Sequence, residues 1–405
     1  MNKRKSSILL TLILILSLII EVKAQQIPGK IILKYYLSIK NQGEMEYSLE
    51  DMRKMILLAW DDYQKLQNLK VSVNGNPITI TNSTVNEDKN IVVQLMGMPN
   101  SLPPKTQIKI EIEMEINLSP RQSPEISIDE SGKLNEIPEN LREKYCQLTG
   151  LWNMSRNAQI IAKNIAQNKT NVMEILVSLI RWIENNIEIP TSGGARIPQY
   201  PDETINSKIG DCDDQSNLLV AMCRSLGIPA YIQMAFIYIE DRRFEDTMFN
   251  GRYKLTAENA GGHAWARVYV PPWGWINVDM TYYIPYEIHG RNIISINPLD
   301  HMRNGALYIS TTIITENFIS GDYINDLKNW MKDLEKYNLM WEEKYSINIQ
   351  TTYPYQTLTD PVILGVAALL IGLTATLIIA YIKISKRKTM KTINIQLTHK
   401  LFRYL

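Results

Sequence analysis

Apolar and polar residues alternate along several segments in the first third of the chain. From Ile108 to Leu118, apolar side chains occupy every even position, with Lys, Glu or Asn between them. This period of two is typical of a strand with one buried face. Leu33–Lys40 follows the same period, and Val71–Ile80 has two apolar runs around Asn74-Gly75, a hairpin signal. We therefore predict a small antiparallel β-sandwich over residues 25–120.

A Ser-, Pro- and Glu-rich linker over residues 121–140 separates this region from a segment with helical periodicity. Val172–Trp182 carries one broad apolar face, which predicts a core-facing helix. A second helix is predicted over Asp211–Leu226 by its end signals. Asp211 can act as the N-cap with Asp214 three residues later, and Gly227 ends the helix.

Strand patterns return after this helix. Ala230–Ile239, His263–Val270 and Trp275–Met280 each have strand character, whereas Glu240–Gly262 is charged and contains glycine. We predict the charged segment to be a long loop or hairpin that borders the cleft and selects substrates. Residues 141–310 therefore form a second, α+β domain.

A three-four spacing of apolar residues runs from Ile324 to Tyr345 and predicts one amphipathic helix within an extension over residues 311–346. A helix that caps the second domain is favoured over a short coiled coil, because coiled coils usually sustain more heptads. Residues 347–361 are predicted to be a polar stalk.

Both ends of the chain have the character of membrane-directed segments. Residues 1–24 combine a basic start with a short apolar run and predict a cleaved signal peptide, with an uncleaved anchor as the alternative. Residues 362–382 are uncharged and predict one transmembrane helix, favoured over a buried core helix. Residues 383–405 are basic and predict a cytoplasmic tail, so the folded domains would lie outside the cell.

Small residues recur every four positions in the predicted membrane helix, at Ala368, Gly372 and Thr376. This spacing lets two helices approach closely and is compatible with a homodimer. The formal net charge of the 405-residue chain is +1, and nothing in it points to nucleic acid as a partner.

Three cysteines give the chain an odd number of thiols, at Cys146, Cys212 and Cys223. Cys212 and Cys223 lie on one predicted helix, about 16 Å apart, which is too far for a disulfide. If a disulfide forms, Cys146–Cys223 is the pair that leaves Cys212 free. Cys212 occupies the first turn of its helix, where the helix dipole favours a thiolate, so we interpret it as a nucleophile and not as a buried structural cysteine.

A cysteine nucleophile needs a base and a group that orients the base. His263 lies on the polar face of its strand, and Asp279 lies on a face of the next strand. The strand register decides whether they meet. If Val270 pairs with Gly274, His263 becomes the diagonal neighbour of Asp279, whereas a shift by one residue separates them. A lone histidine is often merely structural, so this register is the test.

Three blocks of residues resemble the transglutaminase-like superfamily. They are Gly210-Asp211-Cys212-Asp213-Asp214 with the helix up to Ala230, then His263-Ala264-Trp265, and then Gly274-Trp275 with Val278-Asp279-Met280-Thr281. They occur in the family's order and lie within residues 155–290. Met280 stands where the family pattern often has proline, which affects no catalytic group.

The resemblance implies a papain-like core in which Cys212 attacks an amide carbonyl, His263 relays the proton and Asp279 holds His263. Gln215, Trp265 and Asp214 are candidates for oxyanion or supporting roles. The implied substrate is a protein or peptide, with hydrolysis favoured over crosslinking by analogy with prokaryotic members. No metal or other cofactor is expected. The alternative is a non-enzymatic surface module that binds partners through the same fold.

Overall fold

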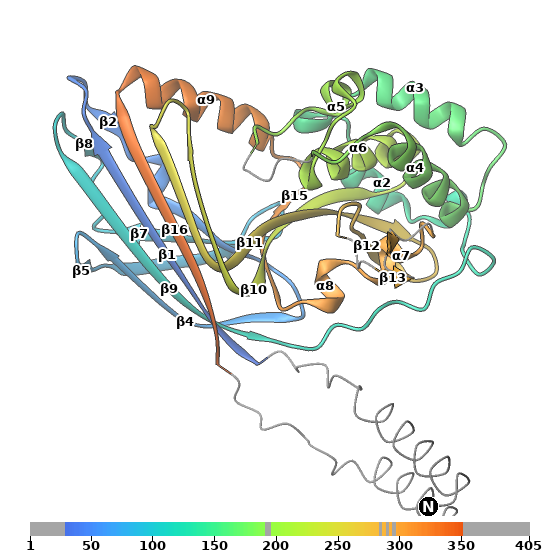
Figure 1. The fold of residues 1–405 in the computed structure, drawn as a ribbon, viewed down its shortest axis with the longest axis horizontal. Coiled ribbons are helices and arrows are strands. Elements are labelled where there is room, and N and C mark those ends of the chain that lie inside the picture. Colours follow the sequence, from blue (N-terminus) through green and yellow to red (C-terminus); the bar gives the residue numbers. More distant parts are fainter. Residues whose placement is uncertain (1–28, 191–195, 283–285, 289–290, 294–296, 351–405) are drawn as a thin grey trace, which may run out of the picture. The chain divides into compact units, whose positions relative to one another are not determined.

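A nine-stranded sheet forms the framework of the protein and is shared by its N-terminal and central segments (Figure 1). The computed structural model describes residues 29–190, 196–282, 286–288, 291–293 and 297–350. The strand order is β15-β10-β11-β16-β1-β9-β4-β5, and β12 pairs with β11 at one side. The strands are β1 (Lys30–Asn41), β4 (Gln64–Val73), β5 (Asn76–Pro77), β9 (Gln107–Leu118), β10 (Ala230–Met248), β11 (Tyr253–Val270), β12 (Gly274–Val278), β15 (Thr312–Phe318) and β16 (Leu339–Gln350).

The N-terminal part of this sheet follows the predicted alternation. In β9 the even positions are buried and the odd positions are exposed or half-buried. β4 and β5 are joined by the predicted turn, in which Asn74 and Gly75 both have positive φ angles. A two-residue turn of this kind matches the twist of an antiparallel hairpin. The sequence therefore predicted β1, β9 and the turn at Asn74-Gly75 correctly. The second arm of the predicted hairpin is wrong, because Thr79 and Ile80 begin β6, which pairs with β7 in another sheet.

A three-stranded sheet packs against the N-terminal part of the large sheet through one hydrophobic core. Its strands are β3 (Lys54–Ala59), β7 (Asn90–Met96) and β6 (Thr79–Val85). A two-stranded ribbon of β2 (Tyr47–Ser48) and β8 (Ser101–Leu102) lies near a 3-10 turn, η1 (Asp51–Arg53). The antiparallel N-terminal sheets are thus present, but one of them continues into the central part of the chain.

Helices cover the β10–β11 half of the large sheet and enclose a second core (Figure 1). Their order along the chain is η2 (Leu134–Glu136), α2 (Glu139–Tyr145), η3 (Gly150–Trp152), α3 (Arg156–Ile165), α4 (Val172–Asn186), α5 (Pro201–Ser207) and α6 (Cys212–Ser225). α6 is buried along most of its length and packs directly on β10 and β11. Two short helices, α7 (Asp300–Arg303) and α8 (Ala306–Ile309), follow a ribbon of β13 (Tyr286–Ile288) and β14 (Arg291–Ile293).

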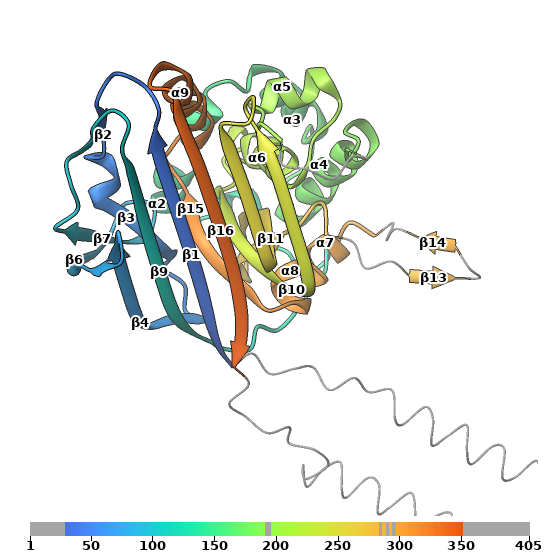
Figure 2. The same cartoon turned by 60° about the vertical axis from the view of Figure 1, so that its left-hand side comes forward.

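The predicted helix through Tyr345 is wrong beyond its first half. The helix α9 spans Tyr323–Lys336, and Asn338 then adopts a positive φ angle. A residue in that conformation ends a helix. Residues 339–350 form β16, which pairs antiparallel with β1 and parallel with β11, so the predicted stalk begins inside a strand (Figure 2). Both β1 and β11 have backbone donors and acceptors that β16 pairs with. These long-range hydrogen bonds outweigh the helical spacing of apolar residues in 339–345.

The charged segment Glu240–Gly262 is the outer part of a long hairpin between β10 and β11 (Figure 2). At its tip, Phe249 packs edge-on against Trp330 of α9, with ring centroids 5.8 Å apart. The tip thus contacts α9, the helix whose Tyr323 hydroxyl lies 3.3 Å from Asp213. At the base of the hairpin, Gly261 and Gly262 directly precede His263. That this segment borders the cleft and selects substrates stays a prediction.

The predicted linker over residues 121–140 packs against the core at two points. Ile126 and Ile137 are buried, and the Gly132 amide donates to the Pro271 carbonyl over 2.8 Å. The predicted signal peptide (1–24), membrane helix (362–382) and basic tail (383–405) lie outside the described residues. Within the described part of the chain, no helix is both long and apolar enough to cross a membrane.

Candidate active site

Cys212 is the first residue of α6, as the end signals in the sequence predicted. Asp211 is the N-cap, and a capping box joins the side chains and backbones of Asp211 and Asp214. The box satisfies amide groups that the first turn of a helix cannot bond internally. The Cys212 side chain is half-buried, and its helix packs on the strand that carries His263.

Asp214 also anchors the segment that precedes α5. It is fully buried, and its carboxylate accepts hydrogen bonds from the Gln199 backbone amide at 2.7 Å and the Gln199 side chain at 2.9 Å. Burial and the charge of Asp211 raise the pKa of Asp214 to about 6, against the lowering effect of the Gln199 donors. Its position supports a structural role, because these bonds tie residues 199–200 to the start of α6.

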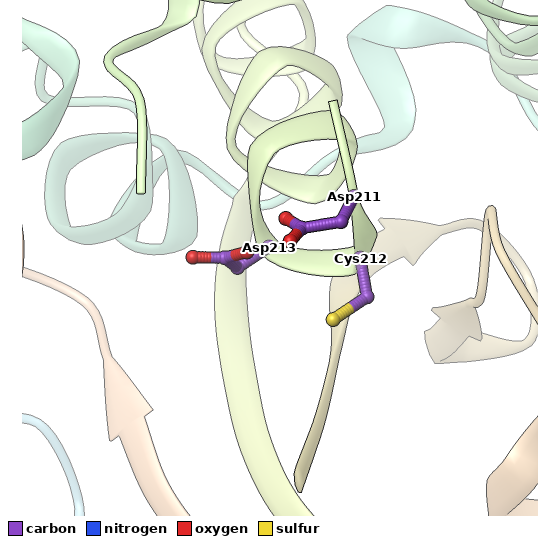
Figure 3. Close-up of side chains that lie close together, drawn as sticks. All are labelled: Asp211, Cys212 and Asp213. Carbon is purple, nitrogen blue, oxygen red and sulfur yellow. The ribbon is translucent and has the colours of Figure 1, made fainter. Parts of the chain in front are cut away.

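Acidic groups surround the thiol at the first turn of α6. Figure 3 shows the carboxylates of Asp211 and Asp213 beside Cys212, and potential ligand atoms of the three residues lie within 4.8 Å of one another. Burial raises the pKa of Asp213, and a hydrogen bond from its protonated form to Asp211 raises it further. The Tyr323 hydroxyl lies 3.3 Å from Asp213. The donor atoms of this group are of a kind that could hold a metal ion.

Burial raises the pKa of the Cys212 thiol, and the charges of Asp213 and Asp211 raise it further. A hydrogen bond from the Ala264 backbone amide acts in the opposite direction. Desolvation and the neighbouring acids thus oppose the thiolate that the helix N-terminus favours. Attack requires the thiolate, so the chemistry needs a base that takes the proton of Cys212.

The pairing of β11 and β12 has the register on which the proposed triad depends. Val270 pairs with Gly274 and Ala266 pairs with Val278, so the next pair in line is Trp265 with Asp279. His263 is then the diagonal neighbour of Asp279. Its Nε2 lies 2.9 Å from both carboxylate oxygens of Asp279. The register prediction is confirmed, and the contact leaves Nδ1 of His263 as the ring nitrogen that can face the thiol.

Asp279 is held as a carboxylate by several donors. Its Oδ1 accepts from the Tyr282 amide at 3.1 Å, and its Oδ2 accepts from the Ala306 amide at 2.9 Å. Burial alone would raise the pKa of Asp279, but the charge and hydrogen bond of His263 and the backbone donors lower it overall. A charged Asp279 fixes the tautomer and orientation of His263, as a base in such a site requires.

Two of the supporting candidates have their donors committed elsewhere. Gln215 is buried, and its side-chain amide donates to the Gly210 carbonyl at 2.8 Å. Trp265 is fully buried, and its indole N–H lies 3.1 Å from side-chain oxygens of Gln233 and Asn277. Both residues therefore stabilise the framework around Cys212 and His263. The backbone amide of Cys212, at the start of α6, is the natural oxyanion donor.

Some residues of the site could not be found in the sequence. Ala306 and Tyr323 reach it from segments that follow Asp279, and no motif marks either of them. The other two thiols are separate from it. All three cysteines are free, so Cys146 and Cys223 form no disulfide here, and burial raises the pKa of Cys146 to about 11.

The arrangement has the parts of nucleophilic acyl transfer: a thiol at a helix start, an imidazole on the adjacent strand and a carboxylate that holds the imidazole. The family model of the transglutaminase-like superfamily matches residues 159–280, a segment that contains all three groups. This segment is a transglutaminase-like core. In the transglutaminase-like core, the nucleophile block lies on α6 and the His and Asp blocks lie on or directly after β11 and β12.

A curated relative aligns with part of this chain. YebA of Bacillus subtilis (strain 168), an uncharacterised protein, is 25% identical over 169 residues, which cover 39% of this chain. The alignment spans 22% of the length of YebA, so less than a quarter of that relative is represented.

Three solved structures are also similar. A candidate cysteine protease from Cytophaga hutchinsonii is 15% identical with a TM-score of 0.45, over 80% of this chain and 90% of its own. The periplasmic domain of TgpA from Pseudomonas aeruginosa, bound to ethylmercury, is 13% identical with a TM-score of 0.26, over 64% and 91%. A candidate protease from Parabacteroides distasonis is 10% identical with a TM-score of 0.25, over 71% and 68%. These TM-scores are too low to carry an argument about this chain.

Proposed function

We propose that the protein is a thiol acyl-transfer enzyme that cleaves amide bonds of proteins or peptides. The observation that carries this proposal is the contact of 2.9 Å between His263 Nε2 and both oxygens of Asp279, next to the helix start that bears Cys212. The same geometry leaves His263 Nδ1 for proton transfer from the thiol.

In the proposed reaction, His263 takes the proton of Cys212 as sulfur attacks the carbonyl carbon. The carbonyl oxygen gains the negative charge, which the Cys212 backbone amide stabilises. The carbon–nitrogen bond then breaks, and His263 returns the proton to the leaving amine. Water attacks the resulting thioester, regenerates the thiol and releases an acid. A primary amine in place of water would give crosslinking, and we favour hydrolysis by analogy with the prokaryotic members of the superfamily that the three sequence blocks resemble.

We further propose that the folded part works outside the cell, tethered by the apolar segment 362–382. The basic residues after that segment support this orientation. A homodimer through the tether is a proposal that rests only on the spacing of Ala368, Gly372 and Thr376.

A non-enzymatic binding module is the second candidate, and one observation favours it. Burial and two neighbouring carboxyl groups raise the pKa of the Cys212 thiol, which would keep an unassisted cysteine unreactive. The two candidates differ in whether His263 activates the thiol.

Alkylation of Cys212 by iodoacetamide tests this difference in the full-length chain. The modified peptide is quantified by mass spectrometry, so that Cys146 and Cys223 do not contribute. If His263 is the base, wild type reacts at pH 7, well below the ordinary thiol pKa of about 8.5, and His263→Ala reacts at least about tenfold more slowly. Slow labelling that His263→Ala leaves unchanged would overturn the enzymatic proposal in favour of the binding module.

Product analysis distinguishes hydrolysis from crosslinking. The full-length chain is incubated with denatured casein and a biotinylated primary amine, with Cys212→Ala as the control. Hydrolysis gives new casein fragments, whereas transfer to an amine gives biotinylated casein. Biotinylation without fragments would overturn the preference for hydrolysis but not the thiol chemistry.

A further inference from the structure

His301 lies in α7, away from the three sequence blocks, and contacts the backbone of Asp279 in two ways. Its carbonyl oxygen accepts from the Asp279 amide at 2.9 Å. Its ring Nδ1 lies 2.9 Å from the Asp279 carbonyl oxygen, within donating distance. The His301 side chain is 4% exposed, so water cannot readily replace either bond.

A third contact fixes the ring of His301 from the other side. Its Nε2 lies 2.7 Å from a carboxylate oxygen of Glu184, near the end of α4. Both ring nitrogens of His301 thus face acceptors. His301 thus links α4 to the backbone of Asp279 through two side-chain contacts, one from each ring nitrogen.

The residues after His301 complete the enclosure of Asp279. The Ala306 amide donates to Oδ2 of Asp279, as described above. A Cβ atom placed on Gly305 would lie 2.8 Å from the Cβ of Asp279, closer than side chains normally approach. Residues 301–306 therefore contact the amide, the carbonyl, the Cβ and the carboxylate of Asp279.

We propose that His301 is a positioning residue that holds Asp279, and through it His263, in the orientation for catalysis, with Glu184 fixing His301. This inference rests on the proposed function, because it concerns the same Cys212–His263–Asp279 group. His301 itself does not touch the thiol or a substrate in this scheme. It acts by restricting where the Asp279 carboxylate can point, and small displacements of such a group are costly to catalysis.

Two amide substitutions separate the two ring contacts. His301→Asn places an N–H donor near the position of Nδ1 and loses the contact with Glu184. His301→Gln places a donor near the position of Nε2 and loses the bond to the Asp279 carbonyl. Both variants remove the ring, so a general loss of packing affects them alike. Thermal unfolding of the full-length chain monitors that loss.

The readout is the alkylation rate of Cys212 between pH 5 and 9, followed as the modified peptide. We expect His301→Gln to react about 10- to 100-fold more slowly at pH 7, with a pH profile like that of Asp279→Asn. We expect His301→Asn to stay within about threefold of wild type, and Glu184→Gln to fall between the two. Equal rates for His301→Asn and His301→Gln, whether fast or slow, would overturn the inference.

His263→Ala separates this inference from the proposed function. If His263→Ala slows alkylation while His301→Gln does not, His263 is the base and only the role of His301 is wrong. If His263→Ala leaves the rate unchanged, the proposed function fails, and the role of His301 falls with it.

Discussion

Asp279 combines nearly complete burial with a negative charge, and its neighbours explain how. A carboxylate in such a position loses its hydration, which favours the protonated form. The charge and hydrogen bond of His263, with the amides of Ala306 and Thr281, outweigh that loss and lower the pKa of Asp279. The charge that orients His263 is therefore also a source of stability, and its size depends on pH.

Asp279→Asn tests this link between charge and stability. Because the folded-state pKa of Asp279 lies below the unfolded value of about 3.9, its contribution is fully present above that value. The contribution is lost as the pH falls through the folded-state pKa. We expect Asp279→Asn to unfold at a lower temperature than wild type at pH 7, and the difference to shrink below about pH 4. Thermal unfolding at pH 7, 5, 4 and 3 measures it, and a difference that stays constant to pH 3 would contradict the assignment.

Gly262 opens the face of β11 next to His263. It is exposed, and a Cβ atom there would meet nothing within 4 Å. Gly262 and Ala264 share a face of the strand, roughly 7 Å apart, and the Ala264 amide reaches Cys212. The missing side chain thus leaves room for a substrate beside the thiol.

We expect Gly262→Leu to fold as well as wild type but to hinder large molecules at the thiol. Iodoacetamide should label Cys212 at a rate within about twofold of wild type, whereas a bulky fluorescent maleimide should react at least about tenfold more slowly. Gly262→Ala is the matched control and should resemble wild type with both reagents. If Gly262→Leu slows neither reagent, the approach to the thiol runs elsewhere.

At the scale of elements, the sequence predicted best where one local rule is decisive. α6 is bounded by a capping box and Gly227, and β9 has an uninterrupted period of two, so both were correct. β16 was misassigned because Trp341 and Tyr345 fit a helical spacing as well as a strand. Its true state depends on hydrogen bonds to β1 and β11, which lie far away in the sequence.

The candidate site shows the same division. Cys212, His263 and Asp279 were identified as candidates because each sits in a motif, whereas the register of β11 with β12 stayed open between two pairings until the structure showed Val270 opposite Gly274. His301 and Ala306 could not be identified, because their roles arise from a segment that folds back onto Asp279. Gln215 and Trp265 were chosen for their donor groups, but those donors serve buried acceptors. Local patterns thus identify reacting groups better than the groups that hold them.

The start of α6 offers an element-scale prediction. Asp214→Ala removes the capping box and the bonds to Gln199, and should cost about 1–2 kcal/mol of stability. It should also free the segment around Gln199, so that trypsin cleaves after Arg196 faster than in wild type. Asp202→Ala is the matched control, because Asp202 accepts from the Asn157 and Ala158 amides at the start of α3 instead. Equal cleavage of the two variants would show that Asp214 does not hold this segment.

At the scale of the whole molecule, β16 joins the two parts of the large sheet. Tyr345 pairs with Tyr35 of β1 on one side and with Ala257 of β11 on the other. Residues 27–350 accordingly form one compact unit. The N-terminal strands therefore support the strand that carries His263, and the two parts should not unfold independently.

Tyr345→Pro tests this continuity. Proline removes a backbone donor from a central strand and should destabilise the unit by about 3 kcal/mol or more, because ladder bonds are lost at the junction of β1 and β11. Tyr345→Thr also removes the ring but retains the backbone donor and strand propensity, so it isolates the effect of the backbone. We expect calorimetry to show one transition in all three proteins, lowest for Tyr345→Pro, with rapid alkylation of buried Cys223 beginning at the same temperature. The contrary outcome is two separate transitions, of which Tyr345→Pro shifts only one. If Cys223 becomes reactive only in the unshifted transition, the core around α6 is stable without the N-terminal sheet. One shared transition would mean that the geometry of His263 depends on strands that begin more than two hundred residues before it.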